Sequence, residues 1–257
     1  MKGLFFLLLI FVVIQSFIKA PEDGLRAKLS DYSFFEGRMT DLKPGKGYEV
    51  YTPSATLFTD YAEKLRFRSL DGRMFAKTFY YYTTRGRRII ETRVLLLTDA
   101  GWLAGSYVWN AEQTEAFLSE KRATTGVSWV DEGGAAHAIR YVIPSKKDCS
   151  GCHNSGGLLM PIGPGLRDLP NWQDSSHTLA QRARAYLAAN CAHCHNPKGV
   201  CAKAKIDFRY EAGMPEAKVL AKAVKYMRQG KMPQLGTTVV HKEGLALIEA
   251  FLNHQNK

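Results

Sequence analysis

The hydrophobic pattern in the first half of the chain is that of a β-rich unit. Between residues 30 and 141, β-branched and aromatic residues occur in short runs that are separated by glycine-containing turns. Such runs are typical of strands, and they cover residues 76–82, 88–97, 102–109, 127–130 and 138–143. Residues 110–118 could form one helix among them. The pattern predicts an antiparallel sandwich or a barrel-like unit over residues 21–144.

From residue 176 onward the apolar positions follow a helical period. The first predicted helix begins at Ser175 or Ser176 and runs directly into Cys191. The second begins near Pro215 and ends at Gly230, and the last covers residues 242–253. Their apolar faces consist of Leu179, Ala183, Tyr186 and Leu187, then Leu220, Ala223, Val224 and Met227, then Leu245, Ile248 and Leu252 with Phe251 beside them.

These two patterns divide the chain into parts. The β-rich domain covers residues 21–144, a Gly- and Pro-rich loop covers residues 145–175, and helices make up residues 176–257. The expected fold class is therefore α+β, with a β-rich domain followed by an all-α domain. No internal repeat is visible apart from the two cysteine motifs described below.

The first twenty residues have the pattern of an export signal. Lys2 precedes an unbroken apolar run over residues 4–14, and Ala20 offers the small residue that signal peptidase requires. The run is too short for a typical membrane span. We expect export with cleavage near Ala20, and no stable membrane span unless this segment stays uncleaved as an anchor.

Two copies of C-x-x-C-H carry the chemistry of the chain. Cys149, Cys152 and His153 form the first copy, and the second, formed by Cys191, Cys194 and His195, follows 42 positions later. Two thiols one helical turn apart can each form a thioether with a haem vinyl group, and the next imidazole can then bind the iron. The sequence therefore predicts two covalently bound c-type haems, which bacteria attach outside the cytoplasm.

Other uses of these cysteines explain less of the pattern. Two C-x-x-C pairs could hold one zinc ion, and one pair could act as a redox dithiol. Neither alternative explains a histidine directly after both pairs. Cys201 is left over, and either an exposed thiol or a buried small hydrophobe would account for it.

The order of elements in residues 176–257 resembles a class I cytochrome c. A helix, C-x-x-C-H, a loop, a second helix, a Met-Pro loop and a terminal helix follow one another, as in that family. The resemblance implies that His195 is the proximal ligand and Met232 the distal ligand of this haem. It also implies that the first and last helices cross through residues such as Tyr186 and Phe251. Met214, which also precedes a proline, is a competing ligand.

The whole chain resembles a family of exported bacterial di-haem c-type cytochromes with a β-rich N-terminal region. The similar stretches are GYEVY (47–51), LFTDYAEKLRF (57–67), YVWN (107–110), YVIP (141–144), PIGP (161–164) and RAYLAANC (184–191). The resemblance implies the cofactor and an exported, periplasmic location rather than a substrate.

The distal ligand of the first haem is open from sequence. His153 should be its proximal ligand, and Met160 is the nearest distal candidate, because seven residues can reach about 25 Å around a haem edge. Pro161 would keep this segment extended. Met160 could equally be a hydrophobic residue packed on the haem, with His177 or His137 as the ligand. His193 is expected to be an exposed spacer, and His241 and His254 to be surface or core histidines.

Charge points to the kind of partner. The 257-residue chain has a net charge of +11, which becomes +9 without Lys2 and Lys19, and the excess is scattered in short clusters. Such clusters are usually solvated, and binding of nucleic acid is not expected of an exported haem protein. An acidic redox partner protein would use the charge for steering.

The leading functional hypothesis is a periplasmic electron carrier without catalytic residues. A di-haem peroxidase or oxidase with one open haem is the enzyme alternative. A haem-containing subunit or binding module of a periplasmic dehydrogenase is the third. Carbon monoxide binding to the reduced protein would separate closed haems from an open one.

Overall fold

The computed structural model describes residues 24–53, 57–131, 133–162, 166 and 168–255. The expected signal segment, residues 1–20, lies outside these residues. No helix in the described part of the chain has the length and hydrophobicity that a membrane crossing demands.

The largest element is one six-stranded antiparallel sheet with the strand order β3-β4-β5-β6-β7-β8. Its strands are β3 (Tyr48–Val50), β4 (Glu63–Ser69), β5 (Met74–Thr83), β6 (Gly86–Thr98), β7 (Gly101–Trp109) and β8 (Ala116–Ser119). Gly86 and Gly101 follow the two tight turns and have φ values of 97° and 114°, which residues with a Cβ rarely adopt. The neighbours in space are thus neighbours in sequence, as expected for successive hairpins.

The two faces of this sheet have different covers. One face buries Phe67, Val94 and Tyr107 under the N-terminal segment that carries Leu29 and Phe34. This segment contains the short strands β1 (Phe35–Glu36) and β2 (Lys43–Pro44) and the 3₁₀ turns Leu29–Asp31 and Met39–Asp41.

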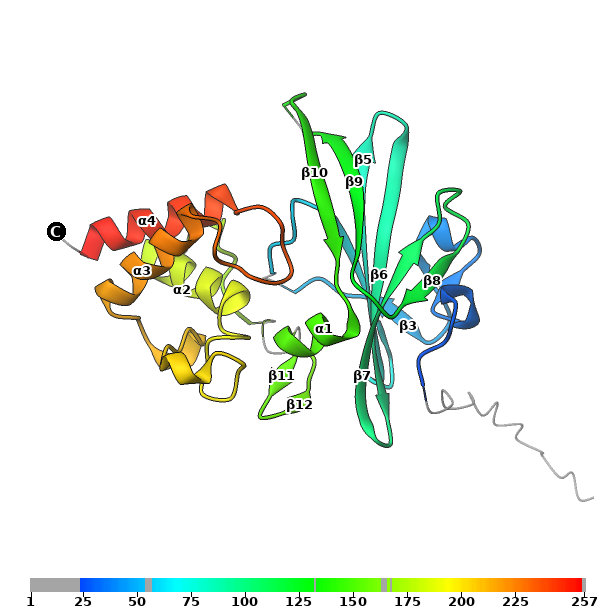
Figure 1. Ribbon diagram of the computed structural model, residues 1–257, viewed down its shortest axis with the longest axis horizontal. Coiled ribbons are helices and arrows are strands. Elements are labelled where there is room, and N and C mark those ends of the chain that lie inside the picture. Colours follow the sequence, from blue (N-terminus) through cyan, green and yellow to red (C-terminus); the bar gives the residue numbers. More distant parts are fainter. Residues whose placement is uncertain (1–23, 54–56, 132, 163–165, 167, 256–257) are drawn as a thin grey trace, which may run out of the picture.

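The opposite face is covered at one end by a β-ribbon. There the two-stranded ribbon of β9 (Ala123–Val130) and β10 (Ala136–Ile143) packs on Phe79, Tyr81 and Ile90. The rest of this face lies towards the helical part of the molecule (Figure 1), and it is lined by the residues of the first candidate site.

From residue 145 onward, the described residues form four α-helices and two small strands. These are α1 (Lys146–Cys152), β11 (Asn154–Ser155), β12 (Leu158–Leu159), α2 (Leu179–Asn190), α3 (Ala217–Arg228) and α4 (Lys242–Gln255), with 3₁₀ turns at Ala202–Ala204 and Tyr210–Ala212. In Figure 1, α2, α3 and α4 lie together at one end of the molecule, and α1 lies between them and the sheet. Helix α4 contacts both α2 and α3.

A glycine sets the approach of α2 to α4. A Cβ built on Gly244 would lie 2.0 Å from Cζ of Tyr186, so no side chain fits at this position. The Tyr186 hydroxyl lies 3.0 Å from Nδ1 of His241, which is buried and stacks on Phe58 at 4.2 Å between ring centroids. Tyr186 and Phe251 both belong to the helical core.

The sheet and the helices are joined by buried polar contacts. The Phe58 N–H donates to the Asn190 side chain at 2.8 Å, and the carboxylate of Asp60 accepts hydrogen bonds from Thr238 and Val239. Asp60 is 2% exposed. The loop between α3 and α4 is therefore held against the segment that leads into the sheet.

The expected fold class is wrong in two respects. The chain is mostly β, with 32% strand against 26% helix, and its second half is not an all-α class I cytochrome c-like domain. Residues 176–255 contain 3₁₀ turns and long irregular segments beside their helices, and Thr238 is hydrogen-bonded to Asp60 in the segment that leads into the sheet. In the described residues, the β-rich half is one open six-stranded sheet with two separate two-stranded ribbons, β1–β2 and β9–β10, not a sandwich or barrel.

Two local predictions are also wrong. Residues 110–118 form a turn followed by strand β8, because the Asn110 side chain accepts from the N–H groups of Thr114 and Glu115 and Gln113 has a φ of 58°. This side-chain bonding competes with a helix. The segment 145–175 is not entirely loop, since it begins with α1.

Candidate functional site

The second motif forms the turn at the end of α2. Cys191 ends this helix, and its N–H donates to the Leu187 carbonyl at 2.8 Å. The N–H of His195 in turn donates to the Cys191 carbonyl at 2.9 Å. The helical hydrogen bonding thus continues irregularly through the motif. This gives the two cysteines and His195 a common cavity.

This C-terminal cavity has a volume of about 400 Å³ and brings together Cys191, Cys194, His195 and Met232. Met232 reaches it from the loop between α3 and α4. Most of the lining is apolar and includes Leu187, Ile206, Phe208, Val219, Ala223, Met227 and Pro233. The four residues predicted to hold the second haem therefore share one apolar cavity, whereas Met214 packs at the edge of the helical core.

A polar atom of the second motif lacks a hydrogen-bond partner at this cavity in the described part of the chain. His195 Nδ1 is buried without a hydrogen-bond partner among the described residues. Burial lowers the pKa of His195 and raises the pKa of Cys191 to about 12. A neutral imidazole and an uncharged thiol suit a cofactor that is attached by thioethers and ligated by nitrogen.

The first motif lies on the short helix α1 and its end. Ser145 and Asp148 form a capping box at the start of α1, and Arg122 makes an ion pair with Asp148 at 2.5 Å. The Arg122 hydrogen bond lowers the pKa of Asp148 to about 2. His153 follows α1, and its Nδ1 lies 2.9 Å from the Met160 carbonyl. This contact fixes the orientation of the His153 ring.

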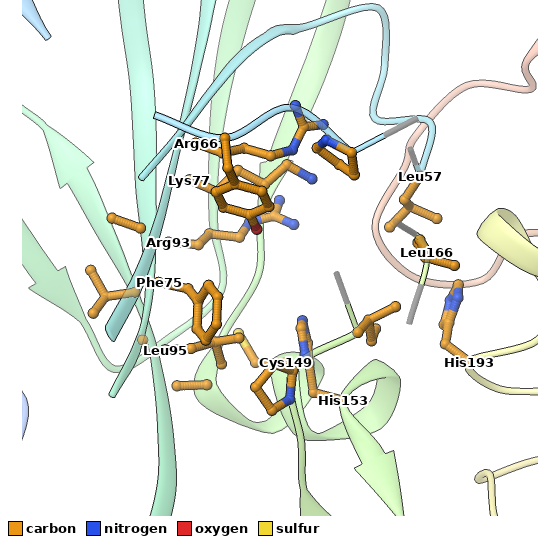
Figure 2. A pocket seen from close by; sticks show the side chains of 18 of the residues that line it. Leu57, Arg66, Phe75, Lys77, Arg93, Leu95, Cys149, His153, Leu166 and His193 are labelled. Atoms are coloured by element: carbon orange, nitrogen blue, oxygen red, sulfur yellow. The ribbon is translucent and has the colours of Figure 1, made fainter. Parts of the chain in front are cut away.

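Two adjoining cavities surround His153. One, of about 130 Å³, lies against the sheet and contains Cys149; the other, of about 720 Å³, is more open and contains Cys152 and Met160. Both are lined by His153, Pro161, Ile162, Leu166 and His193. Figure 2 shows His153 and His193 on different sides of the space that these cavities enclose.

A row of three cations crosses the sheet at this place. Arg66 on β4 is paired in register with Lys77 on β5, and Lys77 is paired with Arg93 on β6. All three line the smaller cavity, and Figure 2 shows their side chains together on one side of it. Burial and then the charge of Arg66 lower the pKa of Lys77 well below its usual value.

Like charges directly opposite one another destabilise a sheet, so this row needs compensation. Glu91, which is fully buried, makes an ion pair with Arg93 at 2.5 Å and accepts from the Tyr141 hydroxyl at 2.7 Å. One carboxylate does not balance three cations. The site is therefore suited to an anionic ligand, such as a group that carries carboxylates.

The two motifs meet between the cavities. Ligand atoms of Cys152, His193 and Cys194 all lie within 4.8 Å of one another. A side-chain hydrogen bond with Cys194, and another with His193, lower the pKa of Cys152, and the contact with Cys152 raises the pKa of Cys194. A cluster of two sulfurs and an imidazole can also bind a metal ion such as zinc directly.

The remaining predicted residues lie as follows. Met160 is 45% exposed and lines the more open cavity. His137 stacks on Trp129 and lies 2.6 Å from the Asp131 carboxylate, and His177 lies 3.8 Å from Asp174. Cys201, the fifth cysteine, is half-buried at the C-terminal cavity. The assignment of Met160 stays a prediction.

Two features of the site were not foreseen from the sequence. The cation row was missed because its members come from three strands, although Lys77 and Arg93 each lie between apolar or β-branched residues of a strand. Such inward-facing cations are a detectable signal. The placement of His193 beside Cys152 depends on long-range packing, and no local pattern could indicate it.

No protein-family model, no curated protein and no solved structure matches this chain.

Proposed function

We propose that the chain is an exported, periplasmic di-haem c-type cytochrome that transfers electrons between redox partner proteins. The observation that carries the proposal is the C-terminal cavity, in which both cysteines of one motif, its histidine and Met232 meet in an apolar lining. The resemblance to exported bacterial di-haem cytochromes agrees with it. Export follows from the chemistry, because bacterial c-type haem is attached outside the cytoplasm.

The residues of the second site fit a haem. Cys191 and Cys194 would anchor it by thioethers, and His195 and Met232 would be its axial ligands. Haem supplies a one-electron couple of its iron. The apolar lining keeps water away from this couple, and a methionine ligand raises its potential.

The residues of the first site fit the same group. Cys149 and Cys152 would anchor it, His153 would bind the iron, and Arg66, Lys77 and Arg93 would neutralise its two propionates. The propionates would be the anionic partners that the buried cation row needs. The contact of Cys152 with Cys194 makes the two attachment sites neighbours, which is what a two-centre relay requires.

A metal ion at Cys152, His193 and Cys194 is the second candidate function, because these ligand atoms lie within 4.8 Å of one another. It uses only one cysteine of each motif. It leaves Cys149, Cys191 and both motif-ending histidines without a role, so haem attachment accounts for more of the site.

Intact-mass measurement of the exported protein tests this proposal. Wild type should carry two covalent haems, and replacement of Cys191 and Cys194 by Ala should leave one. The matched control is Cys201→Ala, which changes a cysteine of the same cavity outside both motifs and should keep two haems. A protein without haem, or one with a stoichiometric zinc ion instead, would refute the proposal.

A further inference from the structure

We propose that His193 is the distal ligand of the first haem, so that one motif supplies the closing ligand of the cofactor attached to the other. The inference rests on the proposed function, since it requires a haem on Cys149 and Cys152. It changes the role of a residue that the sequence marks only as a spacer inside the second motif.

The first argument is position. His193 lines both cavities that surround His153, and Figure 2 shows the two histidines among the residues around the smaller one. Its side chain also lies within 4.8 Å of Cys152, the second cysteine of the first motif. His193 reaches the wall of the C-terminal cavity too, but there Met232 is available as a ligand.

The second argument is the state of the ring. Nδ1 of His193 is buried and has no hydrogen-bond partner among the described residues. A buried ring nitrogen without a partner is energetically unfavourable, and coordination of a metal would remove this cost. His193 thus has one ring nitrogen without a partner in the described part of the chain, while its side chain also interacts with Cys152 of the first motif.

The third argument is the orientation of His153. The Met160 carbonyl accepts a hydrogen bond from Nδ1 of His153 at 2.9 Å, which places the ring proton on Nδ1 and leaves Nε2 with the lone pair. A hydrogen bond of this kind is typical of metal-binding histidines. His153 is therefore prepared as the proximal ligand, and the distal ligand has to come from another segment.

Met160 is not in a good position to be that ligand. Its backbone bonds to His153 twice, through its carbonyl to the ring and through its N–H to the His153 carbonyl at 2.8 Å. The Met160 backbone is thus attached to the proximal residue, on the Nδ1 side of the ring. His137 and His177 are taken up by Asp131 and Asp174, respectively, and neither lines the two cavities.

Ligation by two histidines has a measurable consequence. The first haem would be six-coordinate and closed to carbon monoxide, and it would have a lower potential than the second haem, whose methionine ligand raises the potential. Electron transfer from the first haem to the second would then be thermodynamically favourable. The closed site would argue against a peroxidase-like activity.

The test compares His193→Ala and Met160→Ala in the full chain carrying both haems. The motif Cys-Ala-Ala-Cys-His of the His193 variant is still complete, so both haems should be attached, and intact mass checks this first. After reduction, wild type and Met160→Ala should bind no carbon monoxide. His193→Ala should bind one carbon monoxide per chain, and added imidazole should restore the six-coordinate spectrum.

Other outcomes separate the two proposals. Two haems in every variant, with no carbon monoxide binding in His193→Ala, would overturn the inference and leave the proposed function intact. The same holds if Met160→Ala opens the site instead, or if wild type already binds carbon monoxide. A wild-type protein without covalent haem would refute the proposed function itself.

Discussion

Asp60 connects the loop that carries Met232 to the sheet half of the molecule. Its replacement should therefore lower the free energy of unfolding and destabilise the second site. Its carboxylate accepts from the Thr238 N–H at 2.7 Å, from the Thr238 hydroxyl at 2.7 Å and from the Val239 N–H at 3.0 Å. The carboxylate is almost fully buried, with 2% of the residue exposed. Asp60→Ala removes all three acceptor contacts at once.

The expected loss of stability follows from the N–H groups that lose their hydrogen-bond acceptor. A buried N–H without an acceptor costs about 1–3 kcal/mol, which gives an upper bound of about 6 kcal/mol for two. Thr238 is exposed and Val239 half-buried, so water can reach the freed groups and reduces this cost. Asp60 also has a φ of 47°, which Asp and Asn tolerate better than Ala. We expect a loss of about 3 kcal/mol in the free energy of unfolding.

Asp60→Asn is the matched control. Its amide oxygen can still accept from both N–H groups, and it tolerates the same backbone conformation, so we expect a loss of about 1 kcal/mol or less. Urea denaturation followed by circular dichroism measures both values. In parallel, the weak far-red band expected for methionine-ligated ferric haem should be lost at lower temperature in Asp60→Ala than in Asp60→Asn. Equal stabilities of the two variants, or a loss below about 0.5 kcal/mol in Asp60→Ala, would refute the reasoning.

Lys77→Met should lower the midpoint potential of the first haem by tens of millivolts, because a buried cation near the propionates favours the reduced state; the magnitude assumes an effective dielectric constant of about 20. Lys46→Met, which changes an exposed lysine, should leave that potential unchanged, and equal shifts in a redox titration would contradict the role of the cation row. The pKa of Asp148 is lowered from 3.8 to about 2, chiefly by Arg122. Its contribution to stability is therefore present above pH 3.8 and lost as the pH falls through about 2. Arg122→Met should move acid unfolding to higher pH, and an unchanged midpoint in an acid titration would show that this ion pair contributes nothing.

The sequence predicted local elements better than their assembly. The last three helices were expected within a few residues of α2, α3 and α4, because their apolar stripes and end signals are local features. The strands around 76–109 were predicted for the same reason. How strands combine into sheets depends on contacts between distant residues, and alternation alone fits an open sheet as well as a sandwich.

The residues of the candidate site likewise differ in how far a local sequence pattern indicates them. The cysteines and histidines of both motifs are candidates from their spacing, and Met232 is a candidate through the resemblance to class I cytochromes c; the structure places Cys191, Cys194, His195 and Met232 at one cavity. The cation row could not, because the register that aligns Arg66, Lys77 and Arg93 is set by two hairpins. The sequence pattern singles out none of these strand cations, whereas in the structure Lys77 lies in a cavity wall.

The wrong fold class and the unexpected position of His193 have the same physical cause, which is the contact between the two halves of the chain. The helical half has its own core, and residues 186–235 alone line the C-terminal cavity, but the loop that carries Met232 is also held by the other half of the chain. The loop that carries Met232 is held by Asp60, and Leu235 of the same loop comes within 3.0 Å of a Cβ built on Gly151 in α1. Helix α1 is in turn packed on β7. The sheet half thus holds the Met232 loop, and His193 of the helical half lines both cavities around the first motif. On the proposed ligation by His193, the two sites should form together, and a chain divided near residue 144 would leave the first of them incomplete.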